Sequence, residues 1–500
     1  MKAKNALKDR HIPFSEINIS DYPSKRTDML SLSDSLTVPQ IFFNENHIGG
    51  ATELISLLDE WGEEAFKKYE DDIKSQLDPS DPRLDPPTGE VVVEKAAETR
   101  LEEDRVELPN GGTKTVLEVT KELIDILTIS DLTYRGKLYK SVTPGKVIIS
   151  DLVPRLASNV GEAETFASYL QKRKIINHVT GDHDFTSEGY LFFRLQPFQR
   201  RDILNSFRVW TDRIDPDYML TISRLNKLVD QIISEATDSN GNVDLIAAAK
   251  DESYIKFEEE VCELQGIQMD EMDIPTKTSF LINVYNLMIK YAQIKVGVAS
   301  TNIARASFFA GIKVNIGGQL FSFNELENGL LRANAVPPYS VSKLFTVNDP
   351  RLTLALQEVD PRIHFALNCG AKSCPPVKKF TASALHEELR IVAMAFCEQD
   401  ENVQIDEKKM RVRLNTIFKW YRADFAKSNA LLPRALLHYL RGEKKESLQR
   451  LLKKNEKAIK LMFNEYDWGS DASRSKHFRA SDLKSDSYNI CGLLFPFLLS

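Results

Sequence analysis

The segment from residue 37 to residue 61 constrains the fold of this chain more than any other feature. It reads Thr-Val-Pro at 37–39, Gln40 with an apolar run at 41–43, Gly-Gly at 49–50, and then Leu54, Leu57, Leu58 and Trp61 at helical spacing. That spacing places the four apolar side chains on one face of a helix. A strand, a tight glycine turn and an amphipathic helix in this order predict part of an α/β sandwich.

Helical and strand-like patterns alternate through the whole of residues 1–76. We expect helices over 1–10 and 23–32 and from residue 52 onward. We expect strands over 14–19, 38–43 and 47–48.

Thr-Val-Pro followed by an apolar strand and Gly-Gly resembles the second half of a glutaredoxin, a thioredoxin-like fold. The resemblance implies a cis peptide before Pro39 and a glutathione site that includes Thr37. The backbone of Val38 would pair with the cysteinyl part of glutathione, and the amides of Ala51 and Thr52 would hold its γ-glutamyl carboxylate. Arg26 matches a basic side chain near the glycyl carboxylate.

The expected redox cysteines are missing from this segment. A thioredoxin-like redox site needs a low-pKa thiol at a helix N-terminus, usually in Cys-x-x-Cys, but the first cysteine here is Cys262. Residues 1–7 fit the family helix that directly follows the second active-site cysteine. Either the segment is a truncated thioredoxin fold, or the start was assigned to an internal methionine. We favour the second interpretation, because losing a central strand would destabilise the sheet.

Residues 77–110 are predicted to form an acidic, proline-containing linker, and residues 111–200 a second module. In that module we expect a helix over 119–127, a basic loop, a helix through 166–170 and a strand over 190–195.

Residues 120–195 resemble a DEP domain, which implies a winged-helix-like fold that docks signalling proteins onto membranes or receptors. The stretches Ala163–Leu170, Lys172–Val179 and His183-Asp184-Phe185 carry the resemblance. Lys174 stands where the family usually has glycine, and the family's central tryptophan-leucine signature is absent.

Basic residues gather in this module, with a local charge of +5 between residues 135 and 174 against −7 for the whole chain. A cation near an anionic leaflet contributes about 1 kcal/mol. We predict docking on a membrane surface, or on a membrane-bound receptor or signalling protein, through Arg135, Lys137, Lys140, Lys146, Lys172, Arg173 and Lys174. The alternative is a solvated helix face.

Residues 215–480 are predicted to be mainly helical with a small β element. Five ordered motifs resemble Domain of Unknown Function 547; they lie at 280–287, 323–332, 360–376, 420–425 and 466–468.

His364, Cys369 and Cys374 of the longest motif are candidate catalytic residues. A thiolate with a histidine base is the minimum set for cysteine-dependent acyl transfer. Candidates to orient the imidazole or to meet a carboxylate substrate are Asn283, Glu327, Asn368 and Arg332. A strand through 365–367 would point His364 and Cys369 to opposite faces. Three alternatives stay open: a redox-sensitive cysteine pair, half a metal site, and buried core residues.

Composition narrows the class of protein. A net charge of −7 argues against nucleic acid as the main partner. Five unevenly spread cysteines do not predict a disulfide framework, and residues 1–10 lack a signal-peptide pattern. The apolar stretch 490–499 is too short to span a bilayer. We therefore expect a cytoplasmic protein, with peripheral membrane attachment if the basic module docks.

We predict a multidomain α+β protein with modules at 1–76, 111–200 and 215–480, a linker at 77–110 and a tail at 481–500. Its expected function is intracellular signalling or scaffolding, with glutathione as a cofactor and no metal. The alternative is an enzyme: a glutathione-dependent thiol-disulfide oxidoreductase in a longer form, or a Cys/His-dependent hydrolase in the C-terminal module.

Overall fold

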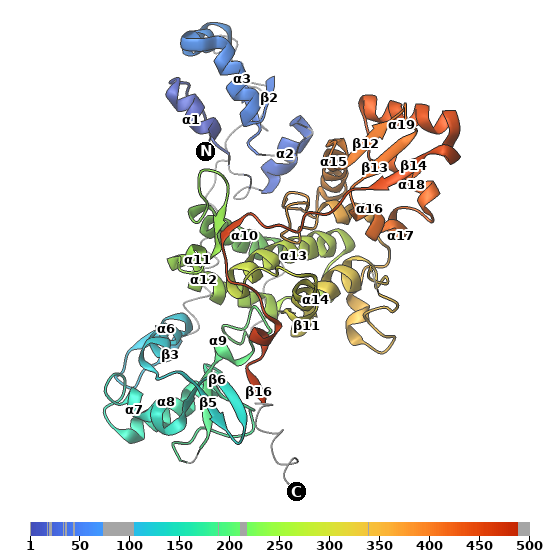
Figure 1. Cartoon of the computed structure of the whole chain (residues 1–500). Coiled ribbons are helices and arrows are strands. Elements are labelled where there is room, and N and C mark those ends of the chain that lie inside the picture. The colour runs from blue at the N-terminus through green and yellow to red at the C-terminus, as the bar shows by residue number, and fades with distance from the viewer. Residues whose placement is uncertain are drawn as a thin grey trace. The chain divides into compact units, whose positions relative to one another are not determined.

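The computed structural model describes residues 2–17, 19, 23–33, 35, 38–43, 46–73, 105–188, 190–210, 218–338 and 340–488. The side chains of Pro23, Ser24, Arg26, Thr27, Leu30, Asp72, Ile73, Ser487 and Tyr488 lie outside this description. Figure 1 shows the whole chain. The chain divides into two compact units, and each unit combines segments that lie far apart in the sequence. Unit 1 comprises 1–93, 360–367 and 375–466, and unit 2 comprises 94–359, 368–374 and 467–500.

Unit 1 begins with a small α/β segment. Its elements are α1 (Lys2–Asp9), α2 (Pro23–Ser33), β1 (Ile41–Phe43), β2 (Asn46–Gly49), α3 (Ala51–Trp61), η1 (Gly62–Glu64), α4 (Ala65–Lys68) and the π-helical turn η2 (Tyr69–Ile73). Leu54 and Leu58 of α3 are fully buried against α1 and Phe43. The three predicted helices and the strand at 47–48 are confirmed, and the apolar faces of α1 and α3 meet in one core.

Two strand predictions in this segment need correction. Residues 14–17 and 19 form no strand, and the strand predicted over 38–43 is limited to 41–43. Among the described residues β1 pairs with β2 alone, in an antiparallel two-stranded sheet. In the described part of the chain, residues 14–17 have no neighbouring strand to complete their backbone hydrogen bonds.

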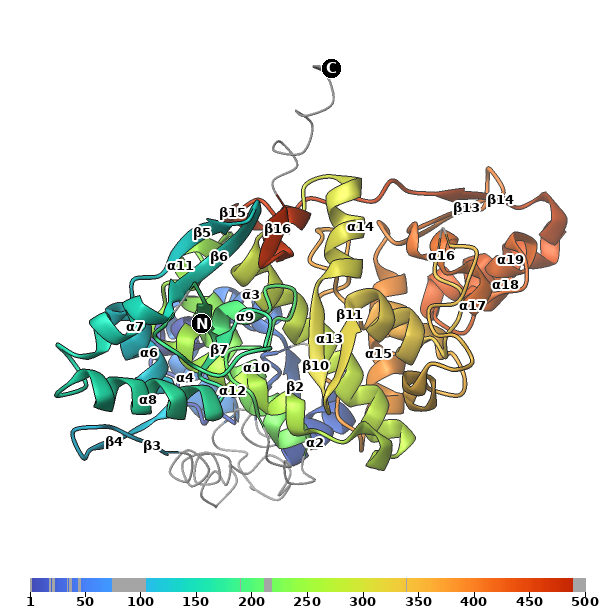
Figure 2. The same cartoon turned by 90° about the horizontal axis from the view of Figure 1, so that it is seen from below.

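The rest of unit 1 is a three-stranded sheet with helices. Its elements are η8 (Pro361–Phe365), α15 (Leu385–Glu398), β12 (Val403–Asp406), β13 (Arg411–Leu414), α16 (Ile417–Trp420), α17 (Arg422–Phe425), η9 (Asn429–Leu431), α18 (Leu432–Leu436), α19 (Gly442–Asn455), η10 (Glu456–Ala458) and β14 (Lys460–Phe463). β13 pairs antiparallel with β12 and parallel with β14. Figure 2 shows α18 and α19 beside these strands. Alternation along β13 buries Val412 and Leu414 and turns Arg411 and Arg413 to the other face.

Residues 361–365 form a 3-10 helix, so the strand predicted through 365–367 is wrong. Pro361 occupies the first turn, where its missing N–H costs nothing. The Asp360 carboxylate accepts a hydrogen bond from the Arg362 amide at 3.0 Å and starts the turn. An apolar run as short as this one does not distinguish a strand from a helical turn.

Unit 2 begins with a module of three longer helices and three hairpins. Its elements are β3 (Arg105–Glu107), β4 (Thr113–Thr115), α6 (Val116–Ile126), β5 (Ser130–Tyr134), β6 (Lys137–Pro144), α7 (Gly145–Leu152), α8 (Val160–Lys172), β7 (Ile176–His178), β8 (Phe192–Leu195) and α9 (Gln196–Gln199). A single core joins α6, α7 and α8 to β7 and β8. The basic segment predicted as a loop is instead the hairpin β5–β6, in which Leu132 faces Tyr139.

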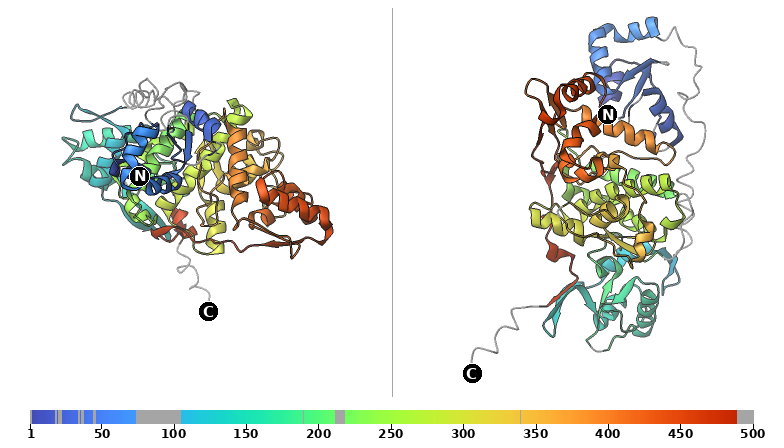
Figure 3. Two further views of the ribbon diagram at one scale, coloured as in Figure 1. Left: turned by 90° about the horizontal axis from the view of Figure 1, so that it is seen from above. Right: turned by 90° about the vertical axis from the view of Figure 1, so that its right-hand side faces the viewer.

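The end of the chain completes the sheet of this module. Strand β16 (Asp486–Tyr488) pairs antiparallel with residues 137–139 of β6, giving the order β16-β6-β8-β7 with β5 on the other side of β6. Figure 3 shows this red segment reaching the hairpin in both views.

The remaining elements of unit 2 surround a long buried helix. They are α10 (Tyr218–Glu235), β9 (Val243–Asp244), α11 (Leu245–Ala248), α12 (Glu252–Glu260), η4 (Val261–Gly266), η5 (Met269–Glu271), α13 (Ile274–Val296), α14 (Asn302–Gly311), β10 (Lys313–Ile316), β11 (Gln319–Ser322), the π-helical η6 (Glu325–Leu331), η7 (Pro350–Leu354), β15 (Ala472–Arg474) and η11 (Ala480–Leu483). Asp273 caps α13 by accepting from the Thr276 amide at 2.8 Å. Helices α10 and α11 and the turn η6 pack against α13.

Candidate functional site

The structure places the Val38–Pro39 peptide next to the N-terminus of α3, and both belong to the predicted glutathione site. The Val38–Pro39 peptide is cis, as the motif predicted. The Pro39 carbonyl oxygen would lie 3.7 Å from a Cβ added at Gly50, the residue that caps α3. Val38 is 64% exposed. The backbone around Pro39 therefore lies beside the first turn of α3, where Ala51 and Thr52 begin the helix.

The first turn of α3 presents amide donors. The opening amides of a helix have no partner within it, and they attract anions. Glu53 meets part of this need, because its Oε2 accepts a hydrogen bond from the Gly50 amide at 2.9 Å. A Cβ at Gly49, whose φ is +112°, would lie 2.9 Å from the Glu53 Cγ, so this capping contact needs glycine there. An incoming carboxylate would meet the amides of Ala51 and Thr52.

Two predicted glutathione residues cannot be placed. Thr37 lies outside the described residues. Arg26 is part of α2, but its side chain lies outside the described part of the chain.

The seven predicted docking cations divide into two groups. Arg135, Lys146, Lys172 and Lys174 are exposed. The other three bind within unit 2: Lys137 Nζ lies 3.4 Å from Asp486, Lys140 Nζ donates to the Ser481 carbonyl, and Arg173 donates to the Arg105 carbonyl. These three side chains stabilise the module itself, a role that the charge count could not reveal.

His364 is held by a carboxylate that the sequence reasoning missed. Its Nε2 lies 2.8 Å from Asp424 Oδ2, and both side chains are buried. The Tyr421 ring stacks on the imidazole at a centroid distance of 3.8 Å. A buried carboxylate that pairs with one ring nitrogen fixes the orientation of the imidazole. The signal was present in the motif at 420–425, but nothing in the sequence linked it to His364.

Cys369 and Cys374 face each other across one loop. Their sulfur atoms are 2.7 Å apart, and the Cys369 amide donates to the Cys374 sulfur at 3.1 Å. Both residues are half-buried. They belong to unit 2, whereas His364 belongs to unit 1.

The other described cysteines are chemically different. Cys262 and Cys397 are completely buried. Burial raises the pKa of the Cys262 thiol to about 12 and also raises the pKa of Cys397. Both therefore stay protonated and unreactive near neutral pH.

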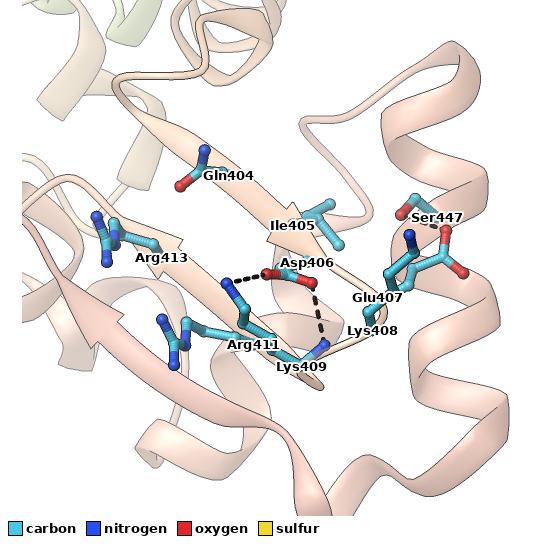
Figure 4. A pocket seen from close by; sticks show the side chains of 9 residues that line it. All are labelled: Gln404, Ile405, Asp406, Glu407, Lys408, Lys409, Arg411, Arg413 and Ser447. Carbon is cyan, nitrogen blue, oxygen red and sulfur yellow. Dashed lines mark hydrogen bonds and ion pairs between the residues drawn. The ribbon is translucent and has the colours of Figure 1, made fainter.

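A pocket of about 470 Å³ opens on the polar side of β12 and β13 (Figure 4). Arg411 and Arg413 line it, and their Nε atoms are buried with no hydrogen-bond partner among the described residues. Asp406 in the same wall accepts from the Lys409 amide, which lowers the pKa of that carboxyl. The pocket has the charge to accept a small anion.

Within the described residues there is no cluster of three or more His, Cys, Asp or Glu side chains that could hold a metal ion. Nor does that part of the chain contain a helix with the length and apolar character needed to cross a membrane.

Comparison with known proteins assigns two parts of the chain. Residues 1–48 match the family model described as Glutaredoxin, and residues 269–397 match the one described as Protein of unknown function, DUF547. The second match includes His364, Cys369 and Cys374. The DEP resemblance of residues 120–195 stays a prediction.

Curated proteins similar to this chain match its N-terminal segment. Glutaredoxin 3 of Escherichia coli (strain K12) is 39% identical over 56 residues, or 11% of this chain and 68% of that protein. Glutaredoxin of Pseudomonas aeruginosa is 35% identical over 57 residues, with the same shares of both chains. No solved structure matches the chain. Through its N-terminal segment, this chain belongs to the glutaredoxin family.

Proposed function

We propose that the protein binds glutathione at its N-terminal segment and takes part in thiol-disulfide chemistry through a thiol outside residues 1–76, because the first cysteine is Cys262. The observation that carries the proposal is the position of the Pro39 backbone beside the first turn of α3, in a segment of the glutaredoxin family. Glutathione is a peptide with a carboxylate at each end. Exposed backbone at Val38 suits its cysteinyl part, and the amides of Ala51 and Thr52 suit its γ-glutamyl carboxylate.

An amide-deleting substitution tests this binding mode. Ala51→Pro removes one N–H at the first helical position, where proline is well tolerated. The preceding Gly50 is already extended, at φ −88° and ψ −163°, as a residue before proline must be. Loss of one charge-assisted hydrogen bond should weaken glutathione binding roughly tenfold to a hundredfold in calorimetry.

Thr52→Ala is the matched control, because it keeps every backbone amide. It should bind glutathione nearly as well as the wild type. Equal weakening by both substitutions, or no binding by the wild-type chain, would contradict the proposal. Reduction of glutathione mixed disulfides by the same protein then tests the redox part.

A second candidate function, as a signalling or scaffold protein, is docking through residues 105–199 onto anionic membranes or membrane-bound partners. Two observations favour it. Over residues 116–195 the element order is helix, hairpin, two helices, hairpin, which suits a DEP-like module. Lys174, at the usual glycine position, has a φ of +57°, a left-handed conformation that glycine adopts readily.

Liposome sedimentation tests docking. Lys172→Gln with Lys174→Gln removes two exposed cations and should lower partition onto anionic vesicles by about thirtyfold. Lys137→Gln is the control, since that side chain already binds Asp486. Vesicle binding that does not change with salt or with vesicle charge would contradict electrostatic docking of this module.

The alternative enzyme is a Cys/His-dependent hydrolase in the C-terminal module. The buried His364–Asp424 pair supports it, because an oriented imidazole is one requirement of such a site. Timed alkylation by iodoacetamide with mass mapping is the test. Much faster modification of one cysteine than of the other favours a nucleophile, and inert cysteines contradict it.

A further inference from the structure

The loop from Asn368 to Cys374 holds two thiols close enough to form a disulfide after a small movement. The sulfurs of Cys369 and Cys374 are 2.7 Å apart. A disulfide has an S–S distance of about 2.05 Å. Closing the bond therefore requires a movement of well under 1 Å by flexible side chains, with no rearrangement of the loop.

Neighbouring segments of unit 2 fix the loop from two sides. From α13, the Asn286 Oδ1 accepts from the Asn368 amide at 2.8 Å, and the Gln293 side chain contacts Gly370. From the segment after 466, the Gly469 carbonyl accepts from the Lys372 amide at 2.8 Å, and the Asp467 amide donates to the Ser373 hydroxyl at 2.8 Å. The two thiols are thus held in place by hydrogen bonds of the loop that do not involve either sulfur.

We propose that Cys369 and Cys374 form a reversible dithiol–disulfide pair that exchanges with glutathione disulfide. The Cys374 thiolate attacks one sulfur of glutathione disulfide, forming a mixed disulfide and releasing one glutathione thiolate. The Cys369 thiolate then attacks the Cys374 sulfur, forming the internal disulfide and releasing the second glutathione. The two cysteines lose two electrons and two protons, and glutathione disulfide gains both to become two glutathione molecules.

The order of attack follows from the local hydrogen bond. The Cys369 amide points at the Cys374 sulfur at 3.1 Å, and a donor in this position favours the thiolate. Cys374 is therefore the attacking residue and Cys369 the resolving one. Because the enclosed loop is short, the disulfide restrains little of the unfolded chain, which keeps the exchange reversible.

The test uses the full chain with Cys491→Ser, so that Cys262, Cys369, Cys374 and Cys397 are the cysteines whose alkylation is measured. The protein is equilibrated in buffers of rising glutathione disulfide to glutathione ratio, quenched by acid, alkylated and mapped by mass spectrometry without reduction. We expect a Cys369–Cys374 disulfide that appears with rising ratio and disappears on return to glutathione. Cys262 and Cys397 serve as internal controls and should remain alkylatable only after unfolding.

Single substitutions test the two steps. Cys369→Ser should stop at a stable mixed disulfide on Cys374, with no internal disulfide. Cys374→Ser should form its adduct on Cys369 at least tenfold more slowly. The disulfide mapping of the protein with both cysteines present does not depend on whether either variant folds.

Three outcomes would overturn the inference: two unmodified thiols at a large excess of glutathione disulfide, a wild-type mixed disulfide that never closes, or no return to thiols in glutathione. The inference is separable from glutathione binding at α3. In Ala51→Pro the internal disulfide should form as in the wild type, because the reaction draws glutathione disulfide from solution.

Discussion

At the scale of single residues, His178 illustrates how burial affects charge. His178 is 5% exposed. Its ring centroid lies 4.9 Å from that of His183, and its Nδ1 lies 3.1 Å from the Thr180 hydroxyl. Burial, with a smaller effect of the His183 charge, lowers the pKa of His178; the charge of Asp182 opposes both. The folded module at 105–199 therefore favours the neutral form of the His178 imidazole.

This gives a pH prediction for the module at 105–199. Well above a pH of about 6.5 His178 is neutral in both the folded and the unfolded state, so its titration does not change stability with pH. Below that pH the unfolded state binds a proton that the folded state resists, and stability falls as pH falls. Amide hydrogen exchange between pH 7 and pH 5 should show this loss. His178→Gln should flatten the slope, and an unchanged slope would assign the acid sensitivity elsewhere.

At the scale of elements, helix α13 positions the cysteine loop. Gly370 has a φ of +82°, and a Cβ added there would lie 2.1 Å from the Gln293 Nε2. Gly318, in the β10–β11 turn, has a φ of +80° and nothing within 4 Å of its added Cβ. The two glycines have nearly the same φ and differ in what an added Cβ would contact.

Alanine at these positions should therefore separate strain from packing. Gly318→Ala should cost about 1 kcal/mol, the left-handed penalty alone. Gly370→Ala should cost about 1 kcal/mol more, because Gln293 must also move. In a Gln293→Ala background the excess should vanish, measured as a double-mutant cycle in urea. Equal costs for both glycines would contradict the anchoring role of α13.

At the scale of the whole molecule, the last described strand ties distant parts of unit 2 together. Asp486 of β16 binds the Arg194 guanidinium at 2.7 Å across 292 residues of sequence, and Arg194 is 2% exposed. Arg194 also donates to the Lys140 carbonyl at 2.9 Å. Burial lowers the pKa of this guanidinium, and the Asp486 charge opposes that shift.

Removing this carboxylate should loosen the attachment of β16. Asp486→Asn leaves a buried cation without its counter-charge and should cost about 2 kcal/mol, below the fully buried range because Asp486 is partly exposed. Asp482→Asn, in an exposed pair with Arg479, should cost nearly nothing. Hydrogen exchange at residues 137–139 reports the difference. Unchanged protection in Asp486→Asn would show that the strand ladder alone holds β16.

The sequence predicted several elements correctly for a local reason. Helices α3 and α6 follow from apolar spacing along a few turns, and the cis peptide at Pro39 follows from a motif of neighbouring residues. The incorrect predictions concern strands, because a strand forms only where another segment supplies its hydrogen-bond partners. Residues 14–17 lack a neighbouring strand among the described residues, and residues 361–365 form a capped helical turn.

The sequence by itself predicted helices α1, α2, α3 and α6 and the glutaredoxin-like turn into α3. It also identified Cys369 and Cys374 as one possible pair among several alternatives. These depend on residues close in the chain, whose geometry is set by local backbone preferences. Only the tertiary structure decided that Asp424 holds His364, that Asn286 holds Asn368 and that Asp486 holds Arg194. These contacts join residues 60, 82 and 292 positions apart. No local preference encodes such contacts, because they exist only when separate elements pack into one core.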